Sequence, residues 1–326
     1  MPARSPSQLA ALIVSLVCTV TATVVGQDRE PKRSLGGHNF VPIDILGDPF
    51  VGTYVRSSTG GGTASGLTLV VPDLEGGDLG TFEASIGFLS LAIEYQQNIT
   101  NWLALRIGGV GGARLGTSVE ALLAEGATAL FGYNVGLSAQ VVRSHRFVLS
   151  ASLDASPNKA YGISPLDFAR SVIDNGLDSA SSLLRKADGR RLYVGARSAF
   201  VVADWLGLQG LLDVGPGKTK TDLEDESMEE EETENQTTVG LGASIDLKRL
   251  INTPIGLTAA YQHKNGLLAR GELNEGADTW NLGVFYTGRR SLSVGIDLIS
   301  ARIPQAQSTD KVNVFGGRFS LRYDLR

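Results

Sequence analysis

Three histidines, His38, His145 and His263, are the residues of this chain best suited to metal or acid–base chemistry. They are far apart in the sequence and lack the HExxH-like spacing that places two imidazoles on one helix face. The sequence therefore predicts no metal site and no cofactor. A serine hydrolase built on strands would need a histidine on an apolar strand face, and His263 has that position. No serine can be paired with it from the sequence, so we expect an interfacial histidine and no enzyme.

A set of charged residues falls on the small, polar faces of segments whose polarity alternates. Charges of this kind could set the selectivity of a narrow polar channel, or they could pair with each other and close it. The candidates are Arg106, Arg197, Arg318, Arg322, Glu83, Glu94, Asp154, Asp213, Asp246 and Asp297.

The segments that carry these charges have an apolar residue at every second position. In the last segment, 312–326, Phe319 and Tyr323 are odd whereas Arg318 and Arg322 are even. A period of two is typical of a β-strand with one apolar face. The opposite faces are mostly Gly, Ser, Asn and Gln, which are shorter and less charged than the surface of a soluble sheet. The pattern favours strands that turn their apolar faces to lipid over a soluble sandwich.

The connections between these segments alternate between short and long, as in an up-and-down antiparallel barrel. We predict an all-β transmembrane barrel of about twelve strands. The strands are 65–71, 81–97, 102–115, 127–143, 146–156, 191–203, 206–215, 237–247, 254–264, 278–288, 291–302 and 312–325. The segment 50–58, FVGTYVRSS, is either part of a pre-barrel segment or an extension of the first strand. The apolar parity of 81–97 changes at Phe88–Leu89, which predicts a β-bulge there.

Composition and the N-terminus set the domain organisation. Residues 1–26 have the pattern of a secretory signal peptide: one basic residue, an apolar run and small residues at the end. Residues 27–64 are then a periplasmic pre-barrel segment, and 65–326 form the barrel. Cys18 lies inside the signal, so we expect no disulfide after cleavage. The net charge is -5 and there is no basic tract, which argues against nucleic acid as a partner.

Two of the long loops have distinctive sequences. Within 157–189, a capping box at Ser164–Asp167 and apolar residues at helical spacing predict an amphipathic helix that ends near Ala187. This helix would either pack on the barrel rim as a lid or fold into the lumen as a constriction. Within 216–236, the run DLEDESMEEEETE predicts a solvated acidic loop. Loose binding of divalent cations, or attraction of cationic solutes, remains an alternative role for it.

With its signal-like N-terminus, its alternating strands and its ending Phe319-Ser-Leu-Arg-Tyr-Asp-Leu325, the chain resembles bacterial outer-membrane β-barrel proteins. The resemblance implies a location in the outer membrane and contact with its lipid. It also implies recognition of the last strand by the barrel-assembly machinery, although Leu325 and Arg326 stand where such proteins commonly end in Phe. Aromatic residues near strand ends would form interfacial girdles. These are Phe131, Phe147, Trp280, Phe315 and Tyr323.

The function that these patterns favour is a small porin-like channel for small polar solutes or ions. The first alternative is a non-conducting barrel with a structural or surface-interaction role. An outer-membrane hydrolase that uses His263 is a third and weaker hypothesis.

Overall fold

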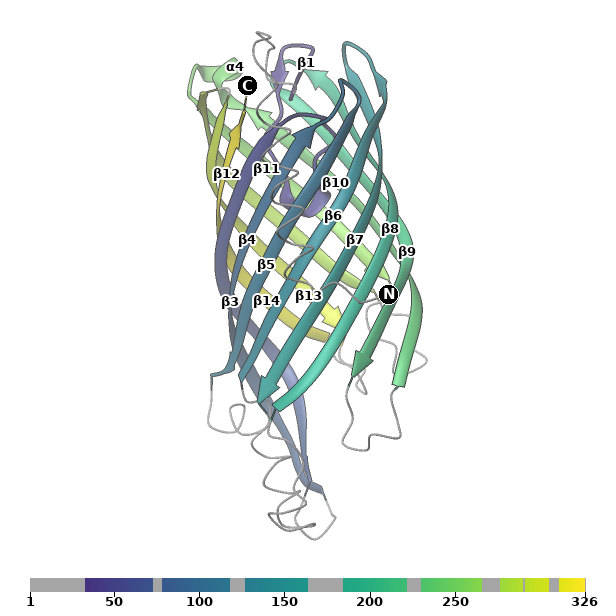
Figure 1. Cartoon of the computed structure of the whole chain (residues 1–326). Helices are drawn as coiled ribbons and strands as arrows, with labels where there is room; N and C mark the ends of the chain where they lie inside the picture. Colours follow the sequence, from purple (N-terminus) through teal and green to yellow (C-terminus); the bar gives the residue numbers. More distant parts are fainter. Residues whose placement is uncertain are drawn as a thin grey trace, which may run out of the picture. The chain divides into compact units, whose positions relative to one another are not determined.

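The computed structural model describes residues 33–72, 78–117, 127–163, 184–221, 230–265, 276–289, 291–304 and 311–325. Twelve antiparallel strands in these ranges form a closed barrel in which neighbours in the sequence pair and β14 returns to β3 (Figure 1). The strands are β3 (Tyr54–Pro72), β4 (Asp78–Asn98), β5 (Leu103–Gly116), β6 (Ala127–Arg143), β7 (Phe147–Ile163), β8 (Leu184–Ala203), β9 (Leu206–Thr221), β10 (Glu230–Asp246), β11 (Ile255–Asn265), β12 (Ala277–Arg289), β13 (Leu292–Pro304) and β14 (Lys311–Asp324). The predicted twelve-strand, up-and-down architecture is confirmed.

Alternation along each strand separates an apolar outer face from a polar lumen. On β12, the side chains of Trp280, Leu282 and Val284 point outward and are more than half exposed. Asn281, which lies between Trp280 and Leu282 in the sequence, points into the lumen and is fully buried. The same contrast holds on β10 between Leu241 and Ser244. A large exposed apolar belt of this kind is stable only where it contacts another apolar phase.

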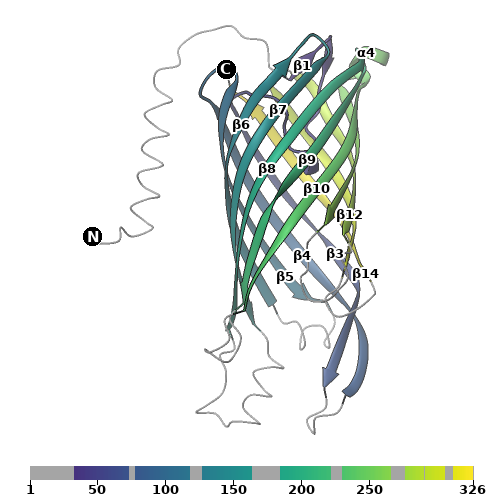
Figure 2. The same ribbon diagram turned by 90° about the vertical axis from the view of Figure 1, so that its right-hand side faces the viewer.

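The short connections lie at one end of the barrel, the end at which the helix α4 (Leu247–Ile251) is labelled in Figure 2, and Tyr54, the first residue of β3, pairs there with Asp324, the last residue of β14. One of these connections contains α4, whose N-cap residue Asp246 accepts a hydrogen bond from the amide of Lys248 at 3.1 Å. The predicted helix that ends near Ala187 lies mostly outside the described residues, and its last positions, 184–187, belong to strand β8. None of the helices in the described ranges has the length and apolar character needed to cross a membrane.

Two details of the first strands differ from the sequence-based expectation. Strand β3 begins at Tyr54, so the segment 50–58 mostly extends the first strand, and the barrel starts earlier than Ser65. No bulge occurs at Phe88–Leu89, because β4 pairs without interruption through these residues with both β3 and β5. The register shifts in β3 instead, between Ser65 and Leu67.

Phe88 therefore faces the lumen, although its apolar side chain suggested the opposite face. It fits there because its partner on β3, Gly62, and the partner of Gly62 on β14, Gly316, are both glycines. A Cβ at Gly62 would lie 2.8 Å from Cζ of Phe88, and one at Gly316 would lie 3.2 Å from it. The space left by these glycines explains why the apolar residues of β4 change from even to odd positions at Phe88–Leu89 although the strand continues there without a bulge.

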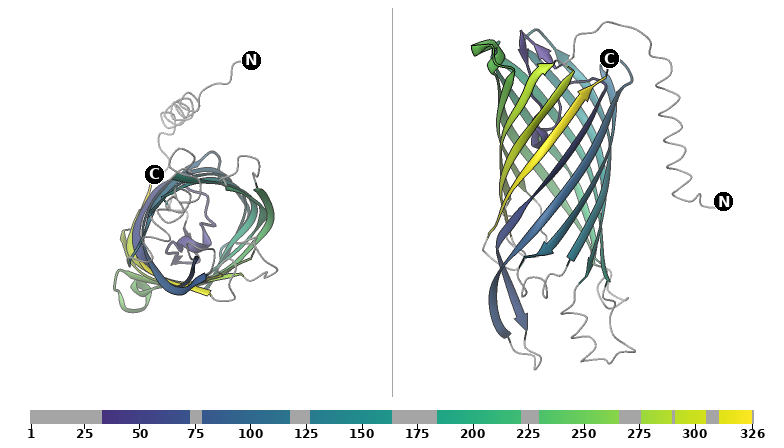
Figure 3. Two further views of the ribbon diagram at one scale, coloured as in Figure 1. Left: turned by 90° about the horizontal axis from the view of Figure 1, so that it is seen from below. Right: turned by 90° about the vertical axis from the view of Figure 1, so that its left-hand side faces the viewer.

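Residues 33–53 precede the barrel and fold back into its lumen, and we call them the plug (Figure 3). The plug contains a two-stranded ribbon, β1 (Ser34–Leu35) and β2 (His38–Asn39), and a 3-10 turn, η1 (Asp44–Leu46). The ribbon contacts the turns at the short-connection end, where Gly36 lies against the carbonyl of His145. The chain descends to η1 and returns to the same end at Thr53, whose carbonyl accepts from the amide of Leu325. Residues 27–64 are therefore not a separate periplasmic segment over the described part, 33–64.

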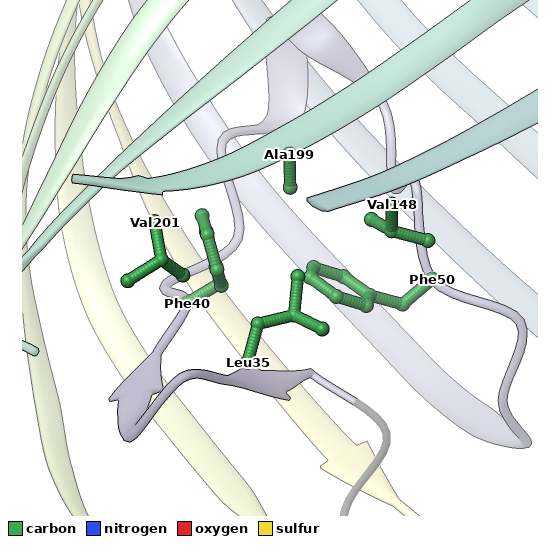
Figure 4. Packing of buried hydrophobic residues seen from close by; sticks show 6 residues of the cluster. All are labelled: Leu35, Phe40, Phe50, Val148, Ala199 and Val201. Atoms are coloured by element: carbon green, nitrogen blue, oxygen red, sulfur yellow. The ribbon is translucent and has the colours of Figure 1, made fainter. Parts of the chain in front are cut away.

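The plug packs against the wall through two apolar clusters. In the first, Leu35, Phe40 and Phe50 of the plug meet Val148, Ala199 and Val201 of β7 and β8 (Figure 4). In the second, Ile43 and Leu46 meet Leu211 and Ala260, with Ile45 at its edge. All members of the two clusters except Ile45 are nearly inaccessible to solvent, which indicates packing of the density found in a protein core.

Glycines on the lumen face make room for the plug. Gly207 lies beneath two aromatic rings: a Cβ there would be 2.5 Å from Cε1 of Phe40 and 2.6 Å from Cδ2 of His38. We expect Gly207→Ala to weaken docking of the plug by about 1–3 kcal/mol, because neither ring has free space to move into. Hydrogen exchange of peptides covering 33–53 would measure the change as faster exchange, with the strands still protected.

The matched control for this substitution is Gly111→Ala. Gly111 is also a strand glycine, but a Cβ there meets nothing within 4 Å. The control should leave exchange of the plug unchanged. Equal protection of the plug in Gly207→Ala and in the wild type would contradict the packing described above.

Candidate functional site

A row of alternating charges crosses the lumen at the level of η1. Asp44 of the plug accepts a hydrogen bond from Nη1 of Arg56 at 2.5 Å, and its Oδ2 lies 3.2 Å from Nη2 of Arg318. Arg318 also lies 3.4 Å from Oδ2 of Asp297, which is fully buried. On the other side, Nη2 of Arg56 is 3.2 Å from Oε2 of Glu94. Asp44 thus joins two arginines of the wall that come from β3 and β14.

The row continues around the wall without a gap. Nε of Arg106 is 4.0 Å from Oε2 of Glu94, and its Nη2 donates to Asp154. Nη2 of Arg197 lies 3.0 Å from Oδ2 of Asp154 and 3.4 Å from Oδ2 of Asp213. Because these groups are withdrawn from bulk water, each charge needs an opposite charge nearby, and the alternation provides it.

A second group of charges holds the base of the plug. Arg322 of β14 donates to Asp48 of the plug and lies 3.0 Å from Oδ1 of Asp324, while its guanidinium stacks 3.7 Å from the ring centre of Tyr54. Arg33 of the plug lies 2.5 Å from Oδ2 of the same Asp324. The plug and the last strand are therefore joined by two arginines and two carboxylates.

Glycines also make room for the carboxylates of the row. A Cβ at Gly136 would overlap Oδ1 of Asp154, and one at Gly195 would overlap Oδ1 of Asp213. The two carboxylates can therefore lie flat against the backbone of the neighbouring strand, within reach of Arg197. Gly47, with φ of +69°, has a similar role in the plug, since a Cβ there would be 2.5 Å from Nε of Arg197.

The candidate charges predicted from sequence can now be placed. Those that belong to the row are Arg106, Arg197, Arg318, Glu94, Asp154, Asp213 and Asp297, and Arg322 belongs to the group at the plug base. Asp246 faces the lumen but caps α4 and is not part of the row. Glu83 is exposed and lies out of phase with Ala84, which is buried. Since β4 has no bulge at Phe88–Leu89, the assignment of Glu83 to the lumen face is corrected.

The sequence analysis did not single out several residues that complete the site. Arg33, Asp44 and Asp48 lie in the plug, which shows no periodicity in sequence. Arg56 lies in the strand-like segment FVGTYVRSS, but it shares its even parity with Phe50 and Tyr54, so the alternation did not mark it as a lumen charge. Lys264 alternates with apolar residues, but it was not included among the candidate charges.

The predicted girdle aromatics point away from the lumen. Phe131, Trp280, Phe315 and Tyr323 are about half exposed or more, and Phe147 is partly exposed. The ring of Trp280 lies 4.8 Å from that of Tyr261, centre to centre.

His263 also lies on the outer surface. Its Nδ1 is 2.8 Å from Oδ1 of Asp278, and its Nε2 is 2.7 Å from Oδ1 of Asn265. The hydroxyl of Tyr261 donates to the same Asp278 oxygen at 2.6 Å. No serine hydroxyl is bonded to this imidazole among the described residues. In the same ranges, no three His, Cys, Asp or Glu side chains gather as a metal site would require.

A cavity of about 270 Å³ lies beside the charge row. Its floor is the plug at 44–47, and its walls come from β3 to β11. Besides charges of the row, it is lined by Lys264 and by the neutral polar residues Asn134, Tyr193, Thr238 and Gln262. A volume of this size has room for about nine water molecules at ~30 Å³ each, or for one small solute.

Several solved structures have a similar fold. The translocator domain of the autotransporter NalP from Neisseria meningitidis has a TM-score of 0.53 and 11% identity, covering 98% of each chain. The transport unit of the autotransporter AIDA-I from Escherichia coli has a TM-score of 0.52 and 13% identity, covering 91% of this chain and 100% of that one. A Pseudomonas aeruginosa FadL homologue has a TM-score of 0.51 and 10% identity, covering 85% and 91%. No protein-family profile and no curated protein sequence matches the chain.

These similarities, together with the apolar outer belt and the polar lumen, define the class of the protein. It is an outer-membrane β-barrel with a closed wall of twelve strands. In barrels of this class the short turns face the periplasm, and on that basis we expect the plug to enter the lumen from the periplasmic end.

His38 fixes the ribbon of the plug to that end. The imidazole is fully buried, with its Nε2 2.9 Å from Oγ of Ser244 and its Nδ1 3.3 Å from the carbonyl oxygen of Asp204. A neutral ring satisfies both contacts if Nδ1–H donates to the carbonyl and Nε2 accepts from the serine. Burial, with a smaller contribution from Arg249, lowers the pKa of His38 from 6.5 to about 4, while Asp204 partly opposes the shift.

This lowered pKa predicts that acid releases the plug. A free plug binds a proton on His38 near pH 6.5, whereas the docked plug does so only near pH 4. Docking is thus fully stable above pH 6.5 and weakens as the pH falls from 6.5 toward 4, by up to about 1.4 kcal/mol per pH unit. Hydrogen exchange of 33–53 at pH 7.5 and 5.0, corrected for intrinsic rates, would report the loss as faster exchange.

Two variants isolate the contribution of His38. His38→Gln should remove this part of the pH dependence, and His145→Gln, at an exposed turn, should keep it. The interpretation is wrong if His38→Gln and the wild type respond to pH in the same way.

Proposed function

We propose that this protein is a gated channel for small polar solutes or ions across the outer membrane, with the plug as its gate. The observation that carries the proposal is the charged, polar cavity that ends on the plug. A solute in this cavity would be separated from the periplasmic end of the lumen by the plug itself.

The path of the plug supports a role as a gate. Both of its ends lie at the periplasmic rim, so it can leave the lumen without threading through the barrel. Several of its contacts with the wall are polar ones that water can replace, such as Gln209 Nε2 to the carbonyl of Val41 at 3.1 Å and Gln262 Nε2 to that of Ile45 at 2.5 Å. Its apolar clusters oppose release, which favours a channel that is closed at rest.

A second candidate function is a non-conducting barrel with a structural or surface-interaction role. The observation that favours it is the same tight closure: paired charges and two apolar clusters fill the periplasmic half of the lumen. The two candidates differ in what removal of the plug produces.

Arg318→Glu provides the first test. It replaces the partner of Asp44 by a third carboxylate next to Asp44 and Asp297, so repulsion should weaken docking by about 3–5 kcal/mol. We expect rare openings of the wild-type protein in planar lipid bilayers and frequent openings of the variant. The charge control is Lys159→Glu, at an exposed pair on β7, and its openings should resemble those of the wild type.

Deletion of residues 35–50 provides the decisive version of this experiment. If the shortened barrel folds, as judged by heat-modifiable migration in gels, it should conduct continuously in uniform steps. A folded deletion variant that leaves the bilayer at its baseline current would rule out the channel and favour the structural role.

A further inference from the structure

We propose that the docked plug holds the closing strands of the barrel together, and that its release loosens the ladder between β3 and β14 more than any other part of the wall. We call this ladder the seam; it pairs residues 54–65 with residues 313–324. In the described barrel the other neighbouring strands follow one another in the sequence, whereas β3 and β14 are its first and last strands. The seam therefore has no connecting turn or loop of its own, and this role of the plug does not depend on conduction.

The centre of the seam has little support from its own side chains. Gly61 pairs there with Gly317, and Gly62 pairs with Gly316. Side chains that lie directly opposite each other on neighbouring strands stabilise a sheet, and glycine has none to contribute. Over these two pairs, opposite side chains add nothing to the backbone hydrogen bonds of the ladder.

Nearer the short-connection end, two like charges lie opposite each other across the seam. Arg56 of β3 pairs directly with Arg322 of β14. Their side chains are only 18% and 3% exposed, so water screens their repulsion poorly. Residues paired in this way have Cβ atoms about 4.5–5.5 Å apart, and like charges at such positions destabilise the sheet. Stacking of the Arg322 guanidinium on the ring of Tyr54, which belongs to β3, offsets part of this repulsion.

The carboxylates of the wall neutralise the seam arginines without joining the two strands. Each of the three arginines has one carboxylate partner in the wall, and this partner lies on the arginine's own side of the seam. The pairs are Arg56 with Glu94 of β4 at 3.2 Å, Arg318 with Asp297 of β13 at 3.4 Å, and Arg322 with Asp324 of β14 at 3.0 Å. The wall charges are therefore balanced without the plug, but these contacts do not hold β3 to β14.

Asp44 of the plug supplies the connection across the seam. Its Oδ1 lies 2.5 Å from Nη1 of Arg56, and its Oδ2 lies 3.2 Å from Nη2 of Arg318. One carboxylate, itself 7% exposed, is thus bonded to β3 through one oxygen and to β14 through the other. Asp48 of the plug accepts from Arg322 and places a negative charge beside the opposed arginines. Contacts between charges so far from bulk water are strong when they are complete.

Docking of the plug and closure of the seam must then stabilise each other. If β3 and β14 separate, Asp44 keeps at most one of its two arginines. If the plug leaves, the seam loses its bridging carboxylate, and the opposed arginines lose the charge of Asp48. Because such coupling is reciprocal, a closed seam favours docking by the same free energy by which the docked plug favours closure.

Hydrogen exchange of the full-length protein in detergent micelles, followed for the variant Asp44→Asn, tests this coupling. Peptides covering 54–65 and 313–324 should exchange about ten-fold faster or more, whereas peptides covering 147–157 of β7 should exchange as in the wild type. The variant should fold, because Arg56 and Arg318 keep their wall carboxylates. The matched control is Asp213→Asn, which removes a carboxylate of the same row on β9 and should leave exchange of the seam unchanged.

A disulfide across the seam gives a second test. Thr59 and Phe319 are direct neighbours on the outer face, and in the oxidised Thr59→Cys/Phe319→Cys protein Asp44→Asn should no longer accelerate exchange of the seam. The control Leu153→Cys/Val194→Cys, which joins β7 to β8, should leave the acceleration intact. All of these proteins carry Cys18→Ser.

Seam exchange that is equal in Asp44→Asn and the wild type, or that rises equally on β7, would overturn the coupling. If Asp44→Asn does not fold by itself, the two disulfides decide. Folding restored by the seam disulfide alone supports the coupling, and any other pattern overturns it. The conductance of the protein with its plug deleted affects neither result.

Discussion

A charge inside a closed barrel must be neutralised within the barrel, because the wall is surrounded by lipid and the plug keeps bulk water from much of the lumen. The alternating row of charges meets this constraint, but two of the carboxylates that neutralise wall arginines belong to the plug and not to the strands. Asp44 and Asp48 of the plug reach Arg56, Arg318 and Arg322, three arginines of the two strands that close the barrel. If the plug leaves, water can enter and solvate the same arginines. Under the proposed gating, the wall charges would therefore be stabilised both with the plug docked and with it released.

The small residues on the lumen face have a specific structural role, which is to leave space for the plug and for the charged side chains. In sequence, their abundance indicated only bends and crowded strands. In the structure, Gly207 leaves space for the rings of the plug, and Gly136 and Gly195 leave space for carboxylates against the backbone. Larger residues at these positions would fill the lumen themselves and would leave no room for either a plug or an ordered row of charges.

The parts of the fold that were predictable from sequence are those encoded within single strands. Alternation and connection length specified the twelve strands and the outward direction of residues such as Trp280, because each strand carries its own pattern. The orientation of Phe88 was mistaken because the space that accepts it belongs to Gly62 and Gly316 on other strands, and the assignment of Glu83 followed from that error. The plug was not predictable for the same reason, since its short, irregular path is determined by tertiary contacts and not by a period.

The contacts of the plug also constrain the order in which the molecule can form. Arg33 is bonded to Asp324, 291 positions later in the chain, and Asp44 and Asp48 are bonded to other residues of the last strand. Their partners are in place only after β14 has met β3 and closed the wall. The plug therefore docks only after the strands have closed the barrel, although it precedes them in the sequence. Contacts between residues so far apart in the sequence form slowly. A newly closed barrel would then have an unobstructed lumen for a time, until the plug, residues 33–53, docks inside it.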